Sequence, residues 1–233
     1  MLYKTRAEAY QAYRDAPDNF FEKYHDKWFN EKDLISPDWT WFETKYHYNL
    51  VENGIIDILR ERYADITGKC VLDVGTGTGH WVDFYLNCLE SGQLTGIDFS
   101  RSSVSALTER YSDYKNVSFQ REDISVRNTR LDKRFDVVNA IGVMFHIVDD
   151  HCWELAVENI VQSLKKDGIA IIGGEFGRET RELGVMRRHR SLDDWEAALK
   201  RAGAEVSGVK YFDWFKGGTN DGLKNNLLAF VRK

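Results

Sequence analysis

Residues 70–81 read CVLDVGTGTGHW, and this stretch carries the strongest structural signal in the sequence. Its first five residues have the apolar density of a short buried strand, and the only charged residue among them is Asp73. Three glycines, Gly75, Gly77 and Gly79, then occupy every second position. Glycine lets the backbone turn tightly and lets a ligand lie directly against it, because no side chain intervenes. The stretch therefore predicts a strand, a glycine turn and the start of a helix.

Strand and helix patterns alternate from this turn to the C-terminus. The predicted strands cover residues 69–74, 93–99, 117–123, 134–145, 168–176, 205–215 and 225–233, and the predicted helices cover 80–90, 100–114, 149–166 and 191–203. Ser191 with Asp194 predicts a capping box, and Gly203 predicts the end of that helix. This alternation predicts an α/β fold, with a mostly parallel sheet, helices on both faces and an antiparallel hairpin at the C-terminus.

Acids occur where the first three of these strands end. Asp73 belongs to the first strand, Asp98 ends the second and Asp123 ends the third. In doubly wound sheets, ligands bind beyond the carboxyl ends of the strands. Three carboxylates disfavour a phosphate ligand, whereas they suit a nucleoside joined to a cationic, amine-bearing group. We therefore expect Asp98 to accept hydrogen bonds from a ribose and Asp123 to accept one from an exocyclic amine.

Three interpretations of the glycine turn compete. A phosphate-binding loop requires Lys and then Ser or Thr after the last glycine, where this chain has His80 and Trp81. A dinucleotide fingerprint requires the spacing G-x-G-x-x-G, and the third glycine here comes one residue early. A tight strand-to-helix turn that binds no ligand also fits the glycines taken alone.

With these motifs in this order, the sequence resembles the class I S-adenosylmethionine-dependent methyltransferase superfamily, in particular small-molecule methyltransferases of types 11 and 12. The segments that carry the resemblance are VLDVGTGTG, GIDFS, EDI, FDVVNAIGVMFHI, LKKDGIAII and SLDDWEAALKRAGAEV, within residues 50–233. The resemblance implies a Rossmann-like fold with a seven-stranded, mostly parallel sheet whose final strand is antiparallel, and an N-terminal helical lid. It also implies S-adenosylmethionine as the cofactor and S-adenosylhomocysteine as its product.

The resemblance also assigns cofactor roles by position. Asp73 and the glycine loop would hold the methionine end, Asp98 the ribose, and the carbonyl groups of Asn139 and Ala140 the methionine amine. Phe99 would flank the adenine, although an ordinary core position also explains this residue. The full set implied to bind the cofactor is Asp73, Gly75, Thr76, Gly77, Gly79, Asp98, Phe99, Asp123, Ile124, Asn139 and Ala140.

The reaction implied is in-line methyl transfer to an oxygen or nitrogen atom of a small molecule. Residues 139–142 read NAIG, not the NPPY or DPPY typical of nucleobase amine methylation. No cysteine stands there to attack a pyrimidine ring, and Asn139 replaces the acid of metal-assisted catechol methylation, so we expect no metal. A protein or RNA methyltransferase, an enzyme of the same fold that uses the sulfonium cofactor for another reaction, and a non-catalytic cofactor-binding protein remain alternatives.

His146 follows the fourth of these strands and is the candidate catalytic base, because an imidazole can remove a proton near neutral pH. A core histidine is the alternative. In the Arg-rich segment 177–190, Arg178 and Arg187 are candidates for binding an acidic group of the acceptor, with a solvated loop as the alternative.

The N-terminal region differs in composition from the rest of the chain. Residues 3–48 hold 13 of the 31 Phe, Trp and Tyr residues, so we divide the chain into an aromatic lid and substrate region, 1–50, and a cofactor-binding domain, 51–233. The aromatics either pack helices onto the sheet or line the acceptor site, where they would favour a cationic group. The candidate acceptor residues of this region are Tyr24, Trp28, Trp41, Tyr46 and His47.

Composition narrows the class of partner. The 233 residues carry a net charge of -5, without a basic face suited to nucleic acid, and no apolar run reaches membrane-spanning length. Three isolated cysteines, an odd number, favour a reducing cytoplasm over a secreted disulfide framework. We therefore expect a cytoplasmic protein that acts on a small molecule, and not on nucleic acid or membranes. The aromatic N-terminal region leaves a homodimer open.

Overall fold

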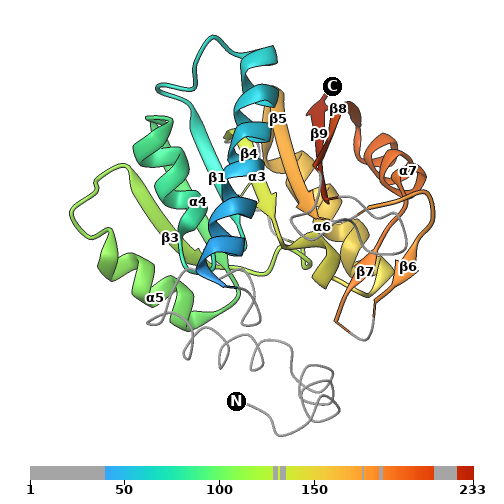
Figure 1. The fold of residues 1–233 in the computed structure, drawn as a ribbon, viewed down its shortest axis with the longest axis horizontal. Coiled ribbons are helices and arrows are strands. Elements are labelled where there is room, and N and C mark those ends of the chain that lie inside the picture. The colour runs from blue at the N-terminus through green and yellow to red at the C-terminus, as the bar shows by residue number, and fades with distance from the viewer. Residues whose placement is uncertain (1–39, 128–130, 132–134, 175, 184–185, 213–224) are drawn as a thin grey trace, which may run out of the picture.

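The computed structural model describes residues 40–127, 131, 135–174, 176–183, 186–212 and 225–233 (Figure 1). Two of the predicted acceptor-site residues, Tyr24 and Trp28, lie outside these ranges. The described chain folds around one seven-stranded sheet and a separate two-stranded hairpin, β6 (Arg181–Glu182) with β7 (Arg188–His189).

The large sheet has the strand order β3-β2-β1-β4-β5-β9-β8. The strands are β1 (Cys70–Val74), β2 (Gln93–Asp98), β3 (Val117–Arg121), β4 (Phe135–Ile141), β5 (Leu164–Gly174), β8 (Ala204–Phe212) and β9 (Asn225–Arg232). Strands β1 to β5 pair in parallel, and β9 is antiparallel to both β5 and β8. The predicted seven-stranded sheet with an antiparallel final strand is confirmed.

Helices cover both faces of this sheet, as predicted (Figure 1). On one face lie α3 (Trp41–Arg62), α4 (His80–Asp83) with its π-helical continuation η1 (Phe84–Cys88), and α5 (Arg101–Arg110). On the other face lie α6 (Asp150–Ser163) and α7 (Leu192–Ala202). Two buried apolar clusters correspond to the two faces, with the side chains of α3, α4, η1 and α5 in one and those of α6 and α7 in the other. The helices therefore shield the sheet and leave its carboxyl edge for ligands.

Helix α3 begins with a capping box in which the Thr40 hydroxyl accepts from the Glu43 backbone and the Glu43 carboxylate accepts from the Thr40 N–H. Its buried face includes Val51 and Ile55, which pack in the cluster on that side of the sheet. The helix continues through residues 50 and 51. The division into a lid of residues 1–50 and a domain of 51–233 therefore passes through a helix, and it stays a prediction.

The predicted end of the helix over 149–166 is wrong, because α6 ends at Ser163 and β5 begins at Leu164. The cause lies in the last strand. Arg232 Nη1 donates to the carbonyl oxygens of Val161, Gln162 and Leu164 at 3.4, 3.1 and 2.8 Å. These contacts satisfy the carbonyl groups that a helix leaves open at its C-terminus.

The strand predicted over 134–145 also ends early, at Ile141. Gly142 adopts φ +78°, a left-handed conformation that glycine tolerates, and the chain turns out of the sheet there. Residues Met144–His146 then form one 3-10 turn, η3. This turn places the end of the predicted strand above the carboxyl edge of the sheet.

Candidate functional site

Two different requirements explain the glycines in the loop after β1. A Cβ at Gly75 would lie 2.4 Å from Val143 Cγ2, and a Cβ at Gly79 would lie 2.6 Å from Leu107 Cδ2. At Gly77 a Cβ would meet only the Gly75 carbonyl oxygen, at 3.8 Å, although φ is +50°. Gly75 and Gly79 are therefore required by packing within the protein, and Gly77 is the position where bare backbone faces open space.

The carboxylate of Asp98 holds this loop in place. Its Oδ2 accepts from the Gly77 N–H and its Oδ1 accepts from the Ser100 N–H, both at 2.9 Å. Asp98 is buried at the end of β2, which pairs directly with β1. Each carboxylate oxygen accepts more than one hydrogen bond, so Asp98 can brace the loop and still accept from a ligand hydroxyl.

A buried polar chain lies beneath the loop. Asn139 Nδ2 donates to Asp73 Oδ1 at 2.7 Å, and the Tyr85 hydroxyl donates to Asn139 Oδ1 at 3.4 Å. Asp73 is fully buried, and its Oδ2 has no hydrogen-bond partner among the described residues. Burial raises the pKa of Asp73 to about 7, against the opposing effect of the Asn139 hydrogen bond. The neighbouring Ala140 and Thr76 are buried too.

The third predicted acid follows β3. Asp123 is exposed, and its Oδ1 accepts from the Ser125 N–H at 2.8 Å and from the Ser125 hydroxyl at 2.6 Å. Ile124 is buried in the core, and its carbonyl oxygen accepts from Asn159 Nδ2 at 2.8 Å. Phe99 is half-buried and follows β2, the strand that pairs with β3. These residues share the carboxyl edge with the glycine loop.

This donor and acceptor set fits a nucleoside that carries a cationic chain. The edge offers carboxylates at Asp98 and Asp123 and open backbone at Gly77. Asp73 adds a buried carboxylate beneath the loop. Acids along three neighbouring strands favour a positively charged ligand over a phosphate.

His146 lies in η3, beyond the end of β4. Its Nδ1 lies 3.0 Å from the Met186 carbonyl oxygen, which can only accept, so Nδ1 carries the proton and Nε2 keeps the lone pair. Burial, with a smaller contribution from the charge of Arg187, lowers the pKa of His146 to about 4, against the opposing effect of the Met186 hydrogen bond. The imidazole is therefore neutral at pH 7, which a proton acceptor requires.

The candidate residues of α3 separate into exposed and partly buried positions. Trp41 and Tyr46 are exposed, and burial lowers the pKa of the partly buried His47 to about 4. The adjacent Tyr48 stacks on His80 with ring centroids 3.4 Å apart.

A glutamate one helical turn further along α3 completes this contact. His80 Nε2 lies 2.9 Å from Glu52 Oε1, so α3 reaches the residue that follows the glycine loop. Sequence reasoning missed Tyr48 and Glu52, although their spacing of four residues places them on one helix face.

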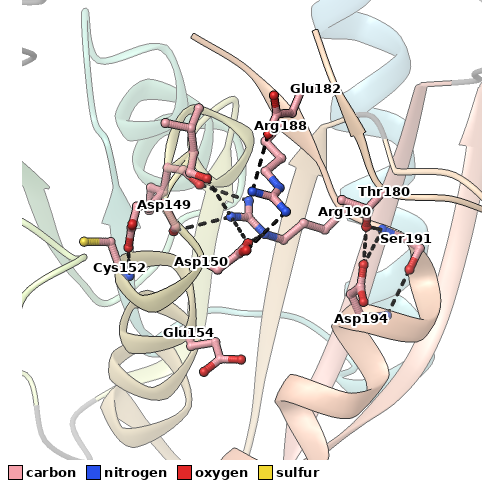
Figure 2. Close-up of polar contacts among 12 residues, drawn as sticks. Asp149, Asp150, Cys152, Glu154, Thr180, Glu182, Arg188, Arg190, Ser191 and Asp194 are labelled. Atoms are coloured by element: carbon pink, nitrogen blue, oxygen red, sulfur yellow. Dashed lines mark hydrogen bonds and ion pairs between the residues drawn. The ribbon is translucent and has the colours of Figure 1, made fainter. Parts of the chain in front are cut away.

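The arginines near β7 differ in how far they are buried. Arg178 and Arg187 are exposed, whereas Arg188 and Arg190 line a hollow at the carboxyl ends of β4 and β5. Figure 2 shows both of these guanidinium groups directed toward Asp150, at the start of α6. Alternation along an extended segment places residues 188 and 190 on one side and 187 on the other. This alternation is the signal in the sequence that separates Arg187 from Arg188 and Arg190.

Aromatic side chains form the rest of this hollow. Phe145, Trp153, Phe176 and Trp195 line it, together with β5 backbone at Gly173 and other neighbours. Trp153 and Trp195 meet edge to face with centroids 4.9 Å apart. The ring centroids of Phe145 and His146 lie 4.4 Å apart, so the hollow adjoins the candidate base.

Within the described ranges, no cluster of three or more His, Cys, Asp or Glu side chains is arranged to hold a metal ion. No helix in the same ranges combines the length and apolarity needed to cross a membrane. The three cysteines are free thiols.

Comparison with known protein families and curated proteins gives a consistent result. A family model described as a methyltransferase domain matches residues 71–168. A malonyl-[acyl-carrier protein] O-methyltransferase of Bacillus cereus is 29% identical over 128 residues, covering 55% of this chain and 45% of that protein. A ubiquinone biosynthesis O-methyltransferase of Rickettsia prowazekii is 28% identical over 153 residues, which cover 65% of this chain and 56% of that protein. The chain spans about half the length of these curated relatives.

A solved structure supports the fold over almost the whole chain. It is the 1,6-didemethyltoxoflavin-N1-methyltransferase of Burkholderia thailandensis, with bound 1,6-didemethyltoxoflavin and S-adenosylhomocysteine. The TM-score is 0.65 and the identity 16%, and the likeness covers 99% of this chain and 92% of that one. At this identity the likeness is one of fold.

Proposed function

We propose that this chain, which belongs to the class I S-adenosylmethionine-dependent methyltransferase superfamily, transfers a methyl group to an oxygen or nitrogen atom of a small molecule. The observation that carries the proposal is the glycine loop, open at Gly77 and braced by Asp98, beside acids on three neighbouring strands. The two O-methyltransferases and the N-methyltransferase among the similar proteins support the same reaction class.

Each strand end would hold a different part of the cofactor. Asp98 would accept from the ribose hydroxyls with the lone pairs that the loop does not use. Asp123 and the Ile124 N–H would meet the adenine edge, with Phe99 against its face. The backbone carbonyl groups of Asn139 and Ala140 would accept from the methionine amine.

The loop itself would complete the cofactor site. Asp73 would act through the loop backbone, because its carboxylate is buried beneath it. Gly75, Thr76 and Gly79 would shape the turn, and Gly77 would leave room for the methionyl chain. S-adenosylmethionine supplies, when bound, a methyl group activated by the sulfonium.

The protein's own contribution would then be to orient the acceptor and take up its proton. Holding two reactants in line can lower the activation barrier by several kcal/mol, so a weak base suffices. His146 would accept the proton at Nε2, because Nδ1 is committed to Met186. Trp41, Tyr46, His47, Arg178 and Arg187 remain our candidates for the outer part of the acceptor site.

The proposal is tested with labelled S-adenosylmethionine and a panel of amines, phenols, carboxylic acids and thiols, by measuring release of S-adenosylhomocysteine. We expect one acceptor class to react, and Asp98→Ala to lower kcat/KM by roughly 100-fold because ligand and loop hydrogen bonds to a charged group are lost. The matched control is Asp113→Ala, an exposed acid beyond α5, which should retain wild-type activity. Wild-type activity in a folded Asp98→Ala variant would refute the cofactor assignment.

The same assay separates the alternatives. A protein or RNA methyltransferase would show no small-molecule turnover and strong salt dependence on a macromolecular acceptor. An enzyme that uses the sulfonium cofactor for another reaction would consume it without transferring the labelled methyl group to any acceptor. A non-catalytic protein would bind it and release nothing.

A further inference from the structure

The helix that follows the glycine loop begins without a capping side chain. Gly79 is the N-cap residue of α4, with φ +92°, and a glycine has no side chain that could accept from the first N–H groups of the helix. The helix is also short, because α4 covers only His80–Asp83 before the π-helical η1 begins. The junction between the loop and α4 therefore depends on contacts from other parts of the chain.

Strand β2 and helix α5 hold the loop from one side. Asp98 Oδ2 accepts from the Gly77 N–H, and the Ser103 hydroxyl donates to the carbonyl oxygen of the same glycine at 2.5 Å. Arg110 Nη1 donates to the Thr78 carbonyl oxygen at 2.8 Å. These contacts engage residues 77 and 78, and none of them reaches the first residue of α4.

Helix α3, which packs over β8 and β9 on the same face of the sheet, holds that first residue. His80 Nε2 lies 2.9 Å from Glu52 Oε1, and the His80 ring stacks on Tyr48 with centroids 3.4 Å apart and an interplanar angle of 13°. Tyr48 is buried, whereas the side chains of His80 and Glu52 are 17% and 24% exposed. The stacking fixes the plane of the imidazole, and the glutamate fixes its rotation within that plane.

The contact between His80 and Glu52 is a hydrogen bond from a neutral imidazole to a carboxylate. Burial, with smaller contributions from Lys45 and His47, lowers the pKa of His80 to about 4, so the ring is uncharged near pH 7 and has a single N–H. A carboxylate only accepts, so that proton is on Nε2. Hydrogen bonds to charged groups are stronger than those between neutral groups. Removing the glutamate would leave a partly buried N–H without this partner.

We propose that Glu52 is a positioning residue for the cofactor, because its hydrogen bond to His80 fixes the junction of the glycine loop with α4. The proposal rests on the proposed cofactor site and specifies how a helix beside that site sets its affinity. Gly77, against which the methionyl chain would lie, is three residues before His80, and Gly79 adds little stiffness between them. Loss of the anchor should therefore loosen the loop and weaken cofactor binding.

The test is calorimetric titration of the full chain with S-adenosylhomocysteine. Glu52→Ala should weaken binding by about fivefold, because the loop loses its anchor. Glu52→Gln should bind within about twofold of the wild type, since its amide oxygen can accept the same proton from His80. Glu61→Ala is the matched control and should bind like the wild type, because Glu61 lies on the same helix, is 66% exposed and pairs with Lys210 instead.

A double-mutant cycle separates this contact from a general effect on α3. His80→Phe keeps a ring that can stack on Tyr48 and loses the N–H, so it should weaken binding as Glu52→Ala does. Adding Glu52→Ala to His80→Phe should change the affinity no further. Additive losses would overturn the proposal, as would wild-type affinity in folded Glu52→Ala or equal losses in Glu52→Ala and Glu52→Gln.

If Glu52→Ala does not fold, Glu52→Gln and His80→Phe decide, because only His80→Phe loses the hydrogen bond. Equal affinities of these two variants would overturn the proposal. Failure of the positioning role leaves S-adenosylhomocysteine binding to the wild type intact. A wild-type protein that does not bind this ligand would contradict the proposed cofactor site itself, and the role of Glu52 with it.

Discussion

The imidazole of His146 is fixed in one tautomer by a backbone carbonyl that belongs to a distant part of the chain. Met186 lies 40 residues away in sequence, and its oxygen is 3.0 Å from Nδ1. The proton is therefore on Nδ1, and Nε2 is the nitrogen that carries the lone pair. Because burial lowers the pKa to about 4, the residue is a weaker base than an ordinary histidine, but it is almost entirely neutral near pH 7.

This combination predicts an unusual pH profile. A base must be unprotonated to act, so the part of the activity that depends on His146 should fall only as the pH approaches 4, and a change near pH 7 would belong to Asp73. His146→Gln should lower kcat by roughly 100-fold and leave S-adenosylhomocysteine affinity unchanged.

The control for this substitution is His151→Gln, because His151 is exposed on α6. It should retain both the wild-type rate and the wild-type pH profile. Full activity in His146→Gln would show that His146 is not the base.

At the scale of the elements, the junction of α6 and β5 depends on one side chain of the last strand. Arg232 donates to three carbonyl oxygens at the end of α6. Arg232→Ala should lower the free energy of unfolding by about 1–3 kcal/mol, because the carbonyl groups of Val161 and Leu164, at two partly buried contacts, lose their partner. Urea denaturation followed by circular dichroism measures this change.

Arg201 provides the comparison, because it forms an exposed ion pair with Glu154 at 2.7 Å. Arg201→Ala should change the free energy of unfolding by less than about 1 kcal/mol. Equal effects of the two substitutions would contradict the capping role of Arg232.

Elements whose signals are local could be predicted from the sequence, and those that depend on distant contacts could not. Ser191, Asp194 and Gly203 cap α7 as predicted, because a helix cap involves neighbours within a few residues. The end of α6 was missed because Arg232 lies about 70 residues away.

The same distinction applies to the site. The acids at the strand ends follow from strand boundaries, so Asp98 and Asp123 could be placed at one edge from sequence. The packing reason for Gly75 could not, because Val143 comes from another strand's loop. Alternation separates Arg187 from Arg188 and Arg190 in the sequence. Which side faces the hollow depends on contacts with Asp150 in another helix, and no local pattern shows that.

At the scale of the whole molecule, most of the proposed functional residues lie along one edge of the sheet. The glycine loop, Asp98 at the end of β2, Asp123 after β3, η3 and the aromatic hollow all lie where the parallel strands end. Strand order places β1 between β2 and β4, so Asp98 on β2 and the candidate base His146 after β4 lie on opposite sides of the glycine loop. This arrangement suits a reaction between two bound molecules.

The most direct test of this account is titration of the purified protein with S-adenosylhomocysteine in a calorimeter. We predict one site per chain with a dissociation constant in the micromolar range or tighter, and affinity weakened about tenfold or more by Asp98→Ala. A folded wild-type protein that releases no heat of binding and gains no thermal stability from the ligand would contradict the assignment of the glycine loop as a cofactor site.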